Sequence, residues 1–284
     1  MTKHGVIKSI SSPRLSSYVT FFGCSSEQDC IHYYFWNQAL ASELYILLGS
    51  IEVCLRNSIH DALSREVSSK LNDGVINDNF SWYEHIDFYE KNKNGSTRLD
   101  RKDEPVFNET GRGFRKITHN KGGGCLNRPP QVVVSKLEFG KWPYVITAKW
   151  YKDGSFIDWN KLFPLIFPNM RKMNHSQHAL IVERVKFTCK WRNRLAHLEP
   201  VWKFSAVIEN GTGRILVKEP SNQDEVIKRL NREIRNSVQL LSWVSEDTAE
   251  HYISTTSYQR LLHLASHDGI REFSCWHKKR TDHF

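Results

Sequence analysis

The sequence predicts an all-α fold: a helical bundle with a long loop-rich insert and one small β-hairpin. Three long segments with apolar residues at helical spacing, about 29–65, 174–197 and 221–243, are the predicted core helices. Between the first two lies a segment of about 72–130 that is dense in Asp, Asn, Gly and Lys. The chain of 284 residues is long enough for a large core, and we predict a single domain over 1–284.

The first core helix is predicted by an apolar stripe with residues every three or four positions, namely Leu40, Leu44, Leu48, Ile51, Leu55, Ile59 and Leu63. Beside the stripe lies a polar row of Glu52, Arg56 and His60, with Asn57 adjoining it. One interpretation is an exposed Glu52–Arg56 ion pair that adds little stability. The other interpretation is that the row orients Arg192 or His197 on the second core helix. The recurrence of an Arg-Asn pair at 192–193 favours this second interpretation.

The insert is predicted to be irregular apart from one short helix at Trp82–Lys91. Its run Gly111–Gly124 alternates basic residues with glycine and lacks a helical period, which predicts a flexible loop. An aromatic ring between cations can stack a nucleobase while the cations hold phosphates. The candidate RNA-binding residues are therefore Arg112, Phe114, Arg115 and Lys116. The alternative is a solvated linker, and the lack of phosphate-loop glycine spacing favours that alternative.

Shorter elements are predicted from local signals. Ser11 and Pro13 open a short helix, further short helices follow Pro129 and cover Trp159–Phe167, and Asn174 caps the second core helix. Two β-rich arms around a glycine turn predict the hairpin at 207–217. Ser221 caps the third core helix, and a terminal helix at Ser257–Leu264 precedes a frayed basic tail at 277–280.

The second core helix ends in Arg192-Asn-Arg-Leu-Ala-His197-Leu-Glu-Pro200, because Pro200 cannot continue it. Asn193 and His197 lie one turn apart on one face. Arg192 and His197 are five positions apart, about 140° around the axis, so they meet only if their side chains converge.

A guanidinium matches phosphate oxygens, and an imidazole exchanges protons near neutral pH. Arg192, Asn193 and His197 are therefore the candidate catalytic residues, and this chemistry needs no metal and no cofactor. The alternative is that Arg192 is a cation facing the helix dipole and His197 an ordinary cap residue.

Composition points to a polyanionic partner. Lys and Arg total 40 against 31 Asp and Glu, giving a net charge of +9 and a pI near 9.2, although such an excess also serves solubility. The cysteines, which form no CxxC motif, are predicted to be reduced and mostly buried: Cys24, Cys30, Cys54, Cys125, Cys189 and Cys275. We expect no signal peptide and no membrane span, and hence a cytoplasmic protein.

Several blocks occur in an order that resembles a known family. They are Trp36-Asn37 with Leu40, Glu52-Val-Cys-Leu-Arg56-Asn57, Phe139-Gly-Lys-Trp142, Phe167-Pro168, and Arg192 to Pro200. Together they resemble the Abi-like (abortive infection) proteins of the HEPN superfamily. The resemblance implies an all-α bundle that forms a homodimer. In it, the Arg and His of an R-x4-6-H motif face their dimer mates across a cleft that cuts RNA without metal.

Carried over by position, Arg192 and His197 are the motif residues and Asn193 is the usual polar neighbour, while Glu199 and Pro200 fit the pattern after the His. Leu198 departs from the pattern, since many relatives have a second His there. The resemblance implies a metal-independent endoribonuclease that acts in phage defence or as a toxin. The alternatives are a non-catalytic RNA-binding dimer regulated by a bound RNA, and a helical partner protein whose motif stabilises the dimer.

Overall fold

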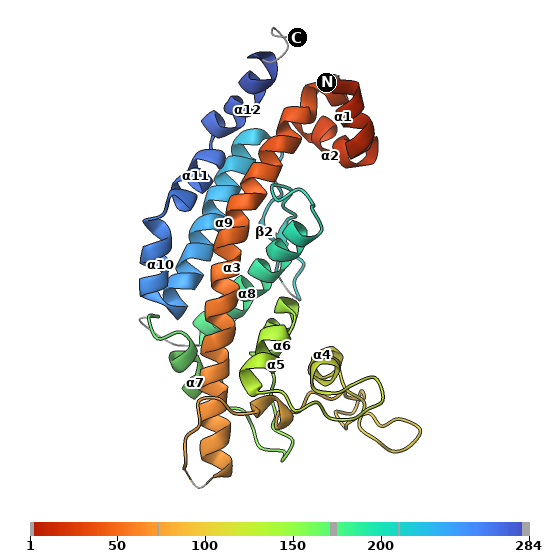
Figure 1. Ribbon diagram of the computed structural model, residues 1–284, viewed down its shortest axis with the longest axis vertical. Coiled ribbons are helices and arrows are strands. Elements are labelled where there is room, and N and C mark those ends of the chain that lie inside the picture. Colours follow the sequence, from red (N-terminus) through yellow and green to blue (C-terminus); the bar gives the residue numbers. More distant parts are fainter. Residues whose placement is uncertain (1–2, 73, 171–174, 210, 280–284) are drawn as a thin grey trace. The chain divides into compact units, whose positions relative to one another are not determined.

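The computed structural model of the chain describes residues 3–72, 74–170, 175–209 and 211–279. Within these ranges it contains twelve α-helices and a single two-stranded sheet (Figure 1), which confirms the predicted all-α fold with one small hairpin. The chain divides into two compact units, a first one of Met1–Gly49, Trp191–Gln239 and Thr248–Phe284 and a second one of Ser50–Lys190 and Leu240–Asp247. The prediction of one domain over 1–284 stays a prediction.

The three predicted core helices are present as α3 (Glu27–Leu71), α8 (His175–Ala196) and α9 (Gln223–Val244), and each contributes residues to both units. All seven residues of the predicted apolar stripe of α3 are fully buried. By length and composition α3 is the one helix in the described ranges that would be able to cross a membrane, a property that it shares with the buried core helices of many water-soluble proteins.

Helix α3 continues six residues beyond its predicted end because its last turns are held by the chain that follows. The side chain of Val67 is buried. The hydroxyl oxygens of Ser64 and Ser68 accept hydrogen bonds from the backbone N–H groups of Phe80 (3.0 Å) and Asn77 (2.8 Å). These tertiary contacts have no counterpart in the helical pattern of the sequence.

The first unit has a core of aromatic and aliphatic side chains between helices. It contains α1 (Lys3–Ile10), α2 (Ser12–Phe22), α11 (Thr256–Leu264) and α12 (His267–Lys279), together with parts of α3 and α9. Trp36 on α3 donates from its indole N–H to the carbonyl of Leu264 (2.8 Å), and Asn231 on α9 donates to the carbonyl of Ala265 (2.7 Å). The C-terminal end of α11 therefore contacts both α3 and α9, and α11 lies beside α9 in Figure 1.

The ends of several elements differ from the predictions. The helix after Ser221 is capped by Asn222, whose side-chain oxygen accepts from the N–H of Glu225 (3.0 Å), while the Glu225 carboxylate accepts from the Ser221 N–H (2.8 Å). The tail predicted to fray is helical as far as Lys279, and Arg280 lies outside the described residues. Helices α1, α10 (Glu246–Ile253) and α12 were not predicted, and Asn174, the predicted cap of α8, lies outside the described residues.

The small hairpin is confirmed, with β1 (Val207–Ile208) antiparallel to β2 (Ile215–Val217). In the second unit, α5 (Pro130–Lys136) and α7 (Trp159–Ile166) match predicted helices. The same unit also contains α6 (Trp142–Val145) and two short 3-10 helices, η1 (Trp82–Glu84) and η2 (Phe139–Lys141).

The predicted helix at Trp82–Lys91 is wrong beyond Glu84. From Ile86 the chain is extended and forms isolated antiparallel bridges, Ile86 with Tyr151, Tyr89 with Phe107, and Lys91 with Thr97. These bridges use backbone N–H and carbonyl groups that a helix would need for its own hydrogen bonds. Non-local strand pairing therefore replaces the helix.

The prediction of an irregular loop over Gly111–Gly124 is also wrong in its first half, because α4 (Glu109–Thr118) occupies it. Asn108 caps this helix, with its side-chain oxygen accepting from the N–H groups of Thr110 and Gly111 (2.9 and 3.0 Å). Phe114 is buried and stacks on Tyr83 (4.9 Å between centroids). Burial of this ring outweighs the low helix propensity of the glycines.

Gly111 is required where α4 touches the preceding extended segment. A Cβ at this position would lie 2.5 Å from the carbonyl oxygen of Phe88 and 2.6 Å from the ring of Phe107. We therefore expect Gly111→Ala to lower the free energy of unfolding by about 1–3 kcal/mol, the usual cost of overpacking. Equilibrium urea denaturation measures this change in the free energy of unfolding. Gly140→Ala is the control, because a Cβ at Gly140 meets no atom within 4 Å. An equal effect of both substitutions would contradict this account.

His60 is a buried neutral imidazole. The indole N–H of Trp82 donates to His60 Nδ1 (2.9 Å), so the proton lies on Nε2, which donates to the side-chain oxygen of Asn79 (3.1 Å). Burial lowers the pKa of His60 below its ordinary value of 6.5, against the opposing effect of the Asn79 hydrogen bond. At pH values below 6.5, the imidazole of His60 binds a proton in the unfolded chain but stays neutral in the folded chain until the pH reaches its lower folded-state pKa.

The stability contributed by His60 is therefore complete above about pH 6.5 and is lost as the pH falls toward the lower folded-state pKa. We expect the free energy of unfolding to fall by up to about 1.4 kcal/mol per pH unit in that window. The slope should decrease in His60→Gln without vanishing, because burial also lowers the pKa of His85. Urea denaturation at several pH values measures the slope, and an unchanged slope in the variant would refute this assignment.

Candidate functional site

The site predicted from the sequence lies at the C-terminal end of α8, in the first unit, and the backbone there forms a Schellman motif. The N–H of Glu199 donates to the carbonyl of Arg194 (2.8 Å), and the N–H of Leu198 donates to the carbonyl of Leu195 (3.1 Å). Leu198 takes the left-handed conformation that closes this motif, with a φ of 55°. His197 is therefore the C-cap residue, and the chain turns away directly after it.

Four side chains hold the chain that follows the helix. Trp191 donates from its indole N–H to the carbonyl of Val201 (3.0 Å), and Asn37 on α3 accepts from the N–H of Val201 (2.9 Å). Arg194 donates to the carbonyls of Pro200 (3.3 Å) and Lys203. Arg14 on α2 donates to the carbonyl of Leu198 (3.1 Å).

These anchors are site residues that sequence reasoning did not assign. Arg194 stands inside the motif and Asn37 inside one of the sequence blocks that resemble the Abi-like proteins, so both lie in segments that the sequence already singled out. Arg14 had no such signal, because it meets Leu198 from 184 positions away in the sequence. Their combined effect is a fixed backbone at the C-cap residue.

The candidate catalytic side chains differ in exposure. Asn193 and His197 are exposed, and the N–H of His197 donates to the carbonyl of Asn193 (3.0 Å), as expected for neighbours one turn apart. Arg192 is half-buried, and Glu199 is exposed. The structure therefore presents an amide and an imidazole to solvent from a rigid helix end, whereas the roles of all four residues stay predictions.

Leu198 carries backbone strain at a position where glycine is usual. Its side chain is 57% exposed, so little packing would be lost on its removal. We expect Leu198→Gly to raise the free energy of unfolding by about 1 kcal/mol, because the left-handed conformation costs an L side chain roughly that much. Urea denaturation measures it. As a control, Ala196→Gly in the last turn should lower the same quantity by about 1 kcal/mol, and a destabilised Leu198→Gly would contradict the strain.

The predicted supporting row lies in the second unit, on α3. Glu52 and Arg56 are half-buried and Asn57 is exposed. The Arg56 Nε is buried without a hydrogen-bond partner among the described residues. The motif residues belong to the first unit, so support of the motif by Glu52, Arg56 and Asn57 stays a prediction.

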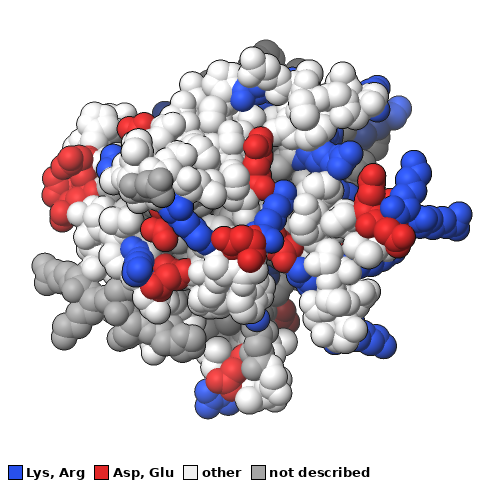
Figure 2. Space-filling model, turned by 90° about the horizontal axis from the view of Figure 1, so that it is seen from below, with Lys and Arg blue, Asp and Glu red and all other residues white. Residues whose placement is uncertain are grey.

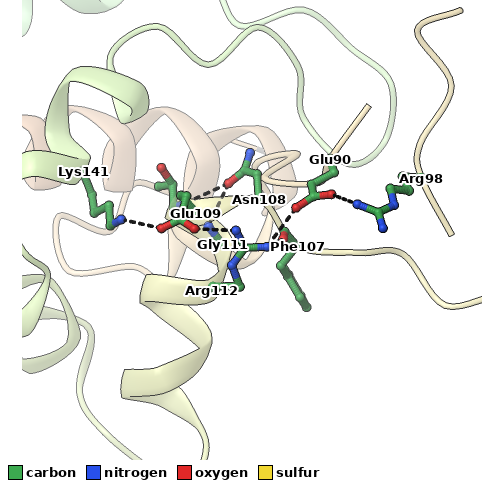
Figure 3. A network of polar contacts seen from close by, with 9 residues as sticks. Glu90, Arg98, Phe107, Asn108, Glu109, Gly111, Arg112 and Lys141 are labelled. Atoms are coloured by element: carbon green, nitrogen blue, oxygen red, sulfur yellow. Dashed lines mark hydrogen bonds and ion pairs between the residues drawn. The ribbon is translucent and has the colours of Figure 1, made fainter. Parts of the chain in front are cut away.

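The predicted RNA-binding residues occupy α4 in the second unit, and two of them are engaged by the chain itself. Arg112 donates to the carboxylates of Glu90 (2.9 Å) and Glu109 (2.5 Å), as Figure 3 shows. The rings of Tyr83 and Phe88 stack against Phe114, and the ring of Trp82 contacts it edge-on. A base would have to displace these rings to stack on Phe114, whereas Arg115 and Lys116 are exposed.

A pocket of about 580 Å³ lies beside the anchored chain in the first unit. Its cations are Arg194 and Lys203, its hydroxyl groups come from Ser16, Ser17, Thr20, Ser205 and Ser221, and its remaining lining residues are Phe21, Trp202, Phe204, Glu219 and Pro220. Arg192 and His197 do not line it. Cations and hydroxyl groups of this kind suit an anionic, hydrogen-bonding ligand.

Within the described part of the chain, no group of three or more His, Cys, Asp or Glu side chains is placed to hold a metal ion.

Comparison with protein families gives a match to the family described as Abi-like protein, over residues 6–203. This range covers well over half of the chain and includes the whole motif from Arg192 to Pro200. The chain belongs to the Abi-like protein family. Comparisons with curated proteins and with solved structures each give no match.

Membership of the Abi-like family implicates the chain in abortive infection, a form of phage defence. The matched range contains the motif and its anchors Arg14, Asn37 and Arg194, and it ends at Lys203, directly after the anchored chain. It excludes the hairpin and helices α9 to α12. The anchored end of α8 is therefore part of what the Abi-like match covers.

Proposed function

We propose that the protein is a metal-independent endoribonuclease of the HEPN type that acts in abortive infection or as a toxin. The observation that carries this proposal is the placement of Asn193, on the last turn of α8, and His197, the C-cap residue that follows it, both exposed in a chain of the Abi-like family. Rigid positioning of a proton-transfer group at a solvent-facing helix end is what general acid–base catalysis requires.

In the proposed reaction the RNA 2′-hydroxyl attacks the adjacent phosphodiester, and the 5′-oxygen of the next nucleotide leaves. His197 takes or returns the proton, and Arg192 stabilises the charge on the pentacoordinate phosphorus. Asn193 holds a phosphate oxygen or fixes the orientation of the imidazole. Only RNA is cut, because DNA lacks the attacking hydroxyl.

The active form is proposed to be a homodimer in which each protomer brings one motif to a shared cleft, as a two-fold axis requires. Net charge supports a polyanionic substrate, since Lys and Arg exceed Asp and Glu by nine. The pocket at Arg194 and Lys203 provides cations beside the motif in the same unit.

The test is incubation of the purified protein with single-stranded RNA in the presence of EDTA, followed by mapping of the product ends. The proposal expects cleavage to persist in EDTA and the 3′ ends to carry 2′,3′-cyclic phosphates. Loss of cleavage on chelation, or 3′-hydroxyl ends, would refute the proposed chemistry. Binding of RNA without any cleavage would instead support a non-catalytic RNA-binding dimer.

A further inference from the structure

A cysteine and a histidine face each other across a tight turn in the second unit. Cys125 Sγ lies 3.5 Å from His119 Nε2, and the two residues form an antiparallel bridge pair. Paired residues in an antiparallel bridge place their side chains next to each other. Cys125 is exposed, although the sequence predicted mostly buried cysteines; Cys30 and Cys189 are buried, and Cys24 and Cys54 are half-buried.

The glycine run of the insert builds this turn. The N–H of Asn120 donates to the carbonyl of Gly124 (2.9 Å), and the Asn120 side-chain oxygen accepts from the N–H groups of Gly122 and Gly124 (3.0 and 2.9 Å). Gly123 has a φ of 83°, which glycine adopts without strain. The run Gly122–Gly124 therefore fixes Cys125 opposite His119.

The hydrogen bonds of Thr118 determine which nitrogen of His119 carries the proton. The Thr118 hydroxyl donates its one proton to the carbonyl of Phe114 (3.0 Å), and its oxygen lies 2.9 Å from His119 Nδ1. Both contacts are hydrogen bonds only if Nδ1–H is the donor to Thr118. His119 Nε2 then has a free lone pair that faces Cys125, so the imidazole is arranged to accept the thiol proton.

The pair opens into a pocket of about 400 Å³ that carries positive charge. Arg115 and Lys152 line it, against a single carboxylate, Glu84. Among the described residues neither cation has an ion-pair partner: Arg115 lies over the Phe107 ring and Lys152 over the Tyr89 ring, each at 5.4 Å.

Many other cations of the second unit are neutralised by neighbouring carboxylates. Examples are Arg65 with Asp61, Lys70 with Asp153, and Arg98 with Glu90. Figure 2 shows acidic and basic side chains interspersed on one face of the molecule. The pocket beside Cys125 is therefore a local site of attraction for a small anion.

We propose that Cys125 is a reactive thiol, activated by His119, that forms a mixed disulfide with a small anionic disulfide bound in this pocket. His119 Nε2 accepts the Cys125 proton as the sulfur attacks one sulfur of the disulfide. The new Cys125 S–S bond forms, the original S–S bond breaks, and the departing thiolate takes the proton from His119. The site is independent of the proposed nuclease motif, which lies in the first unit.

The test treats the full-length protein with oxidised glutathione and follows each cysteine by mass spectrometry of peptides. We expect a glutathione adduct on Cys125 first, reversible by dithiothreitol. His119→Gln should slow its formation about tenfold, because the base is removed. Adduct formation on Cys24 or Cys54 before Cys125, or an unchanged rate in His119→Gln, would overturn the proposal. Circular dichroism verifies that the variant is folded.

A matched pair of alkylating reagents tests the class of ligand. Iodoacetate is anionic and iodoacetamide is neutral, and both react with the same sulfur. The double variant Arg115→Gln and Lys152→Gln should slow alkylation of Cys125 by iodoacetate several-fold and leave the rate with iodoacetamide nearly unchanged. Equal effects on both reagents, or no effect on either, would overturn the assignment of an anionic ligand.

Discussion

His197→Ala is expected to reduce RNA cleavage by about 10²–10⁴-fold, the usual contribution of a positioned general acid or base. RNA affinity should stay nearly unchanged, because His197 is exposed at a helix end whose backbone is held by other residues. Folding stability should also be preserved, since the hydrogen bonds of the Schellman motif use only backbone atoms. Single-turnover cleavage of a labelled RNA, with affinity measured by filter binding, separates the two effects.

The matched control is His251→Ala. His251 is an exposed histidine on α10, outside the family match, so its loss should leave cleavage at the wild-type rate. If both variants cleave RNA equally well, His197 is an ordinary cap residue and the catalytic assignment fails. If neither the wild type nor any variant cleaves RNA but all bind it, the binding alternative replaces the nuclease.

The parts of the fold that the sequence predicts are those that local pattern determines. The stripe from Leu40 to Leu63 predicted both the helix and its burial, because each residue contributes to the same face. Pro200 and the spacing of the motif predicted the end of α8 to within one residue. Helix α4 was missed because its glycines suggested a loop, although Asn108 offered a cap signal at its start.

The anchors of the site were missed for a different reason. Asn37 meets Val201 from 164 positions away, and no periodicity connects two such residues. The pairing of His119 with Cys125 depends on the turn that Asn120 closes with its side chain. Hydrogen bonds of this kind are made by the tertiary fold, so a single sequence gives the candidate residues of a site but not the side chains that hold them.

A buried ion pair supports the first unit beneath the anchored chain. Arg229 Nε lies 2.8 Å from the Glu233 carboxylate, and both side chains are less than one-tenth exposed. The Arg229 guanidinium lies over the ring of Phe204 (5.5 Å), which is in turn 6.1 Å from the ring of Trp191. The pair therefore contacts the chain segment that follows the motif.

Glu233→Leu is expected to lower the free energy of unfolding by about 3–5 kcal/mol, because it leaves the Arg229 cation buried without its carboxylate. The double variant Arg229→Met and Glu233→Leu should regain most of this loss, since two apolar side chains of similar volume replace the pair. The exposed pair Arg65–Asp61 is the control, and Asp61→Asn should cost less than about 1 kcal/mol. Equilibrium urea denaturation of the wild type and the three variants measures these differences in the free energy of unfolding. A double variant as unstable as Glu233→Leu alone would mean that the shape of the two side chains, and not their charge, is what the core requires.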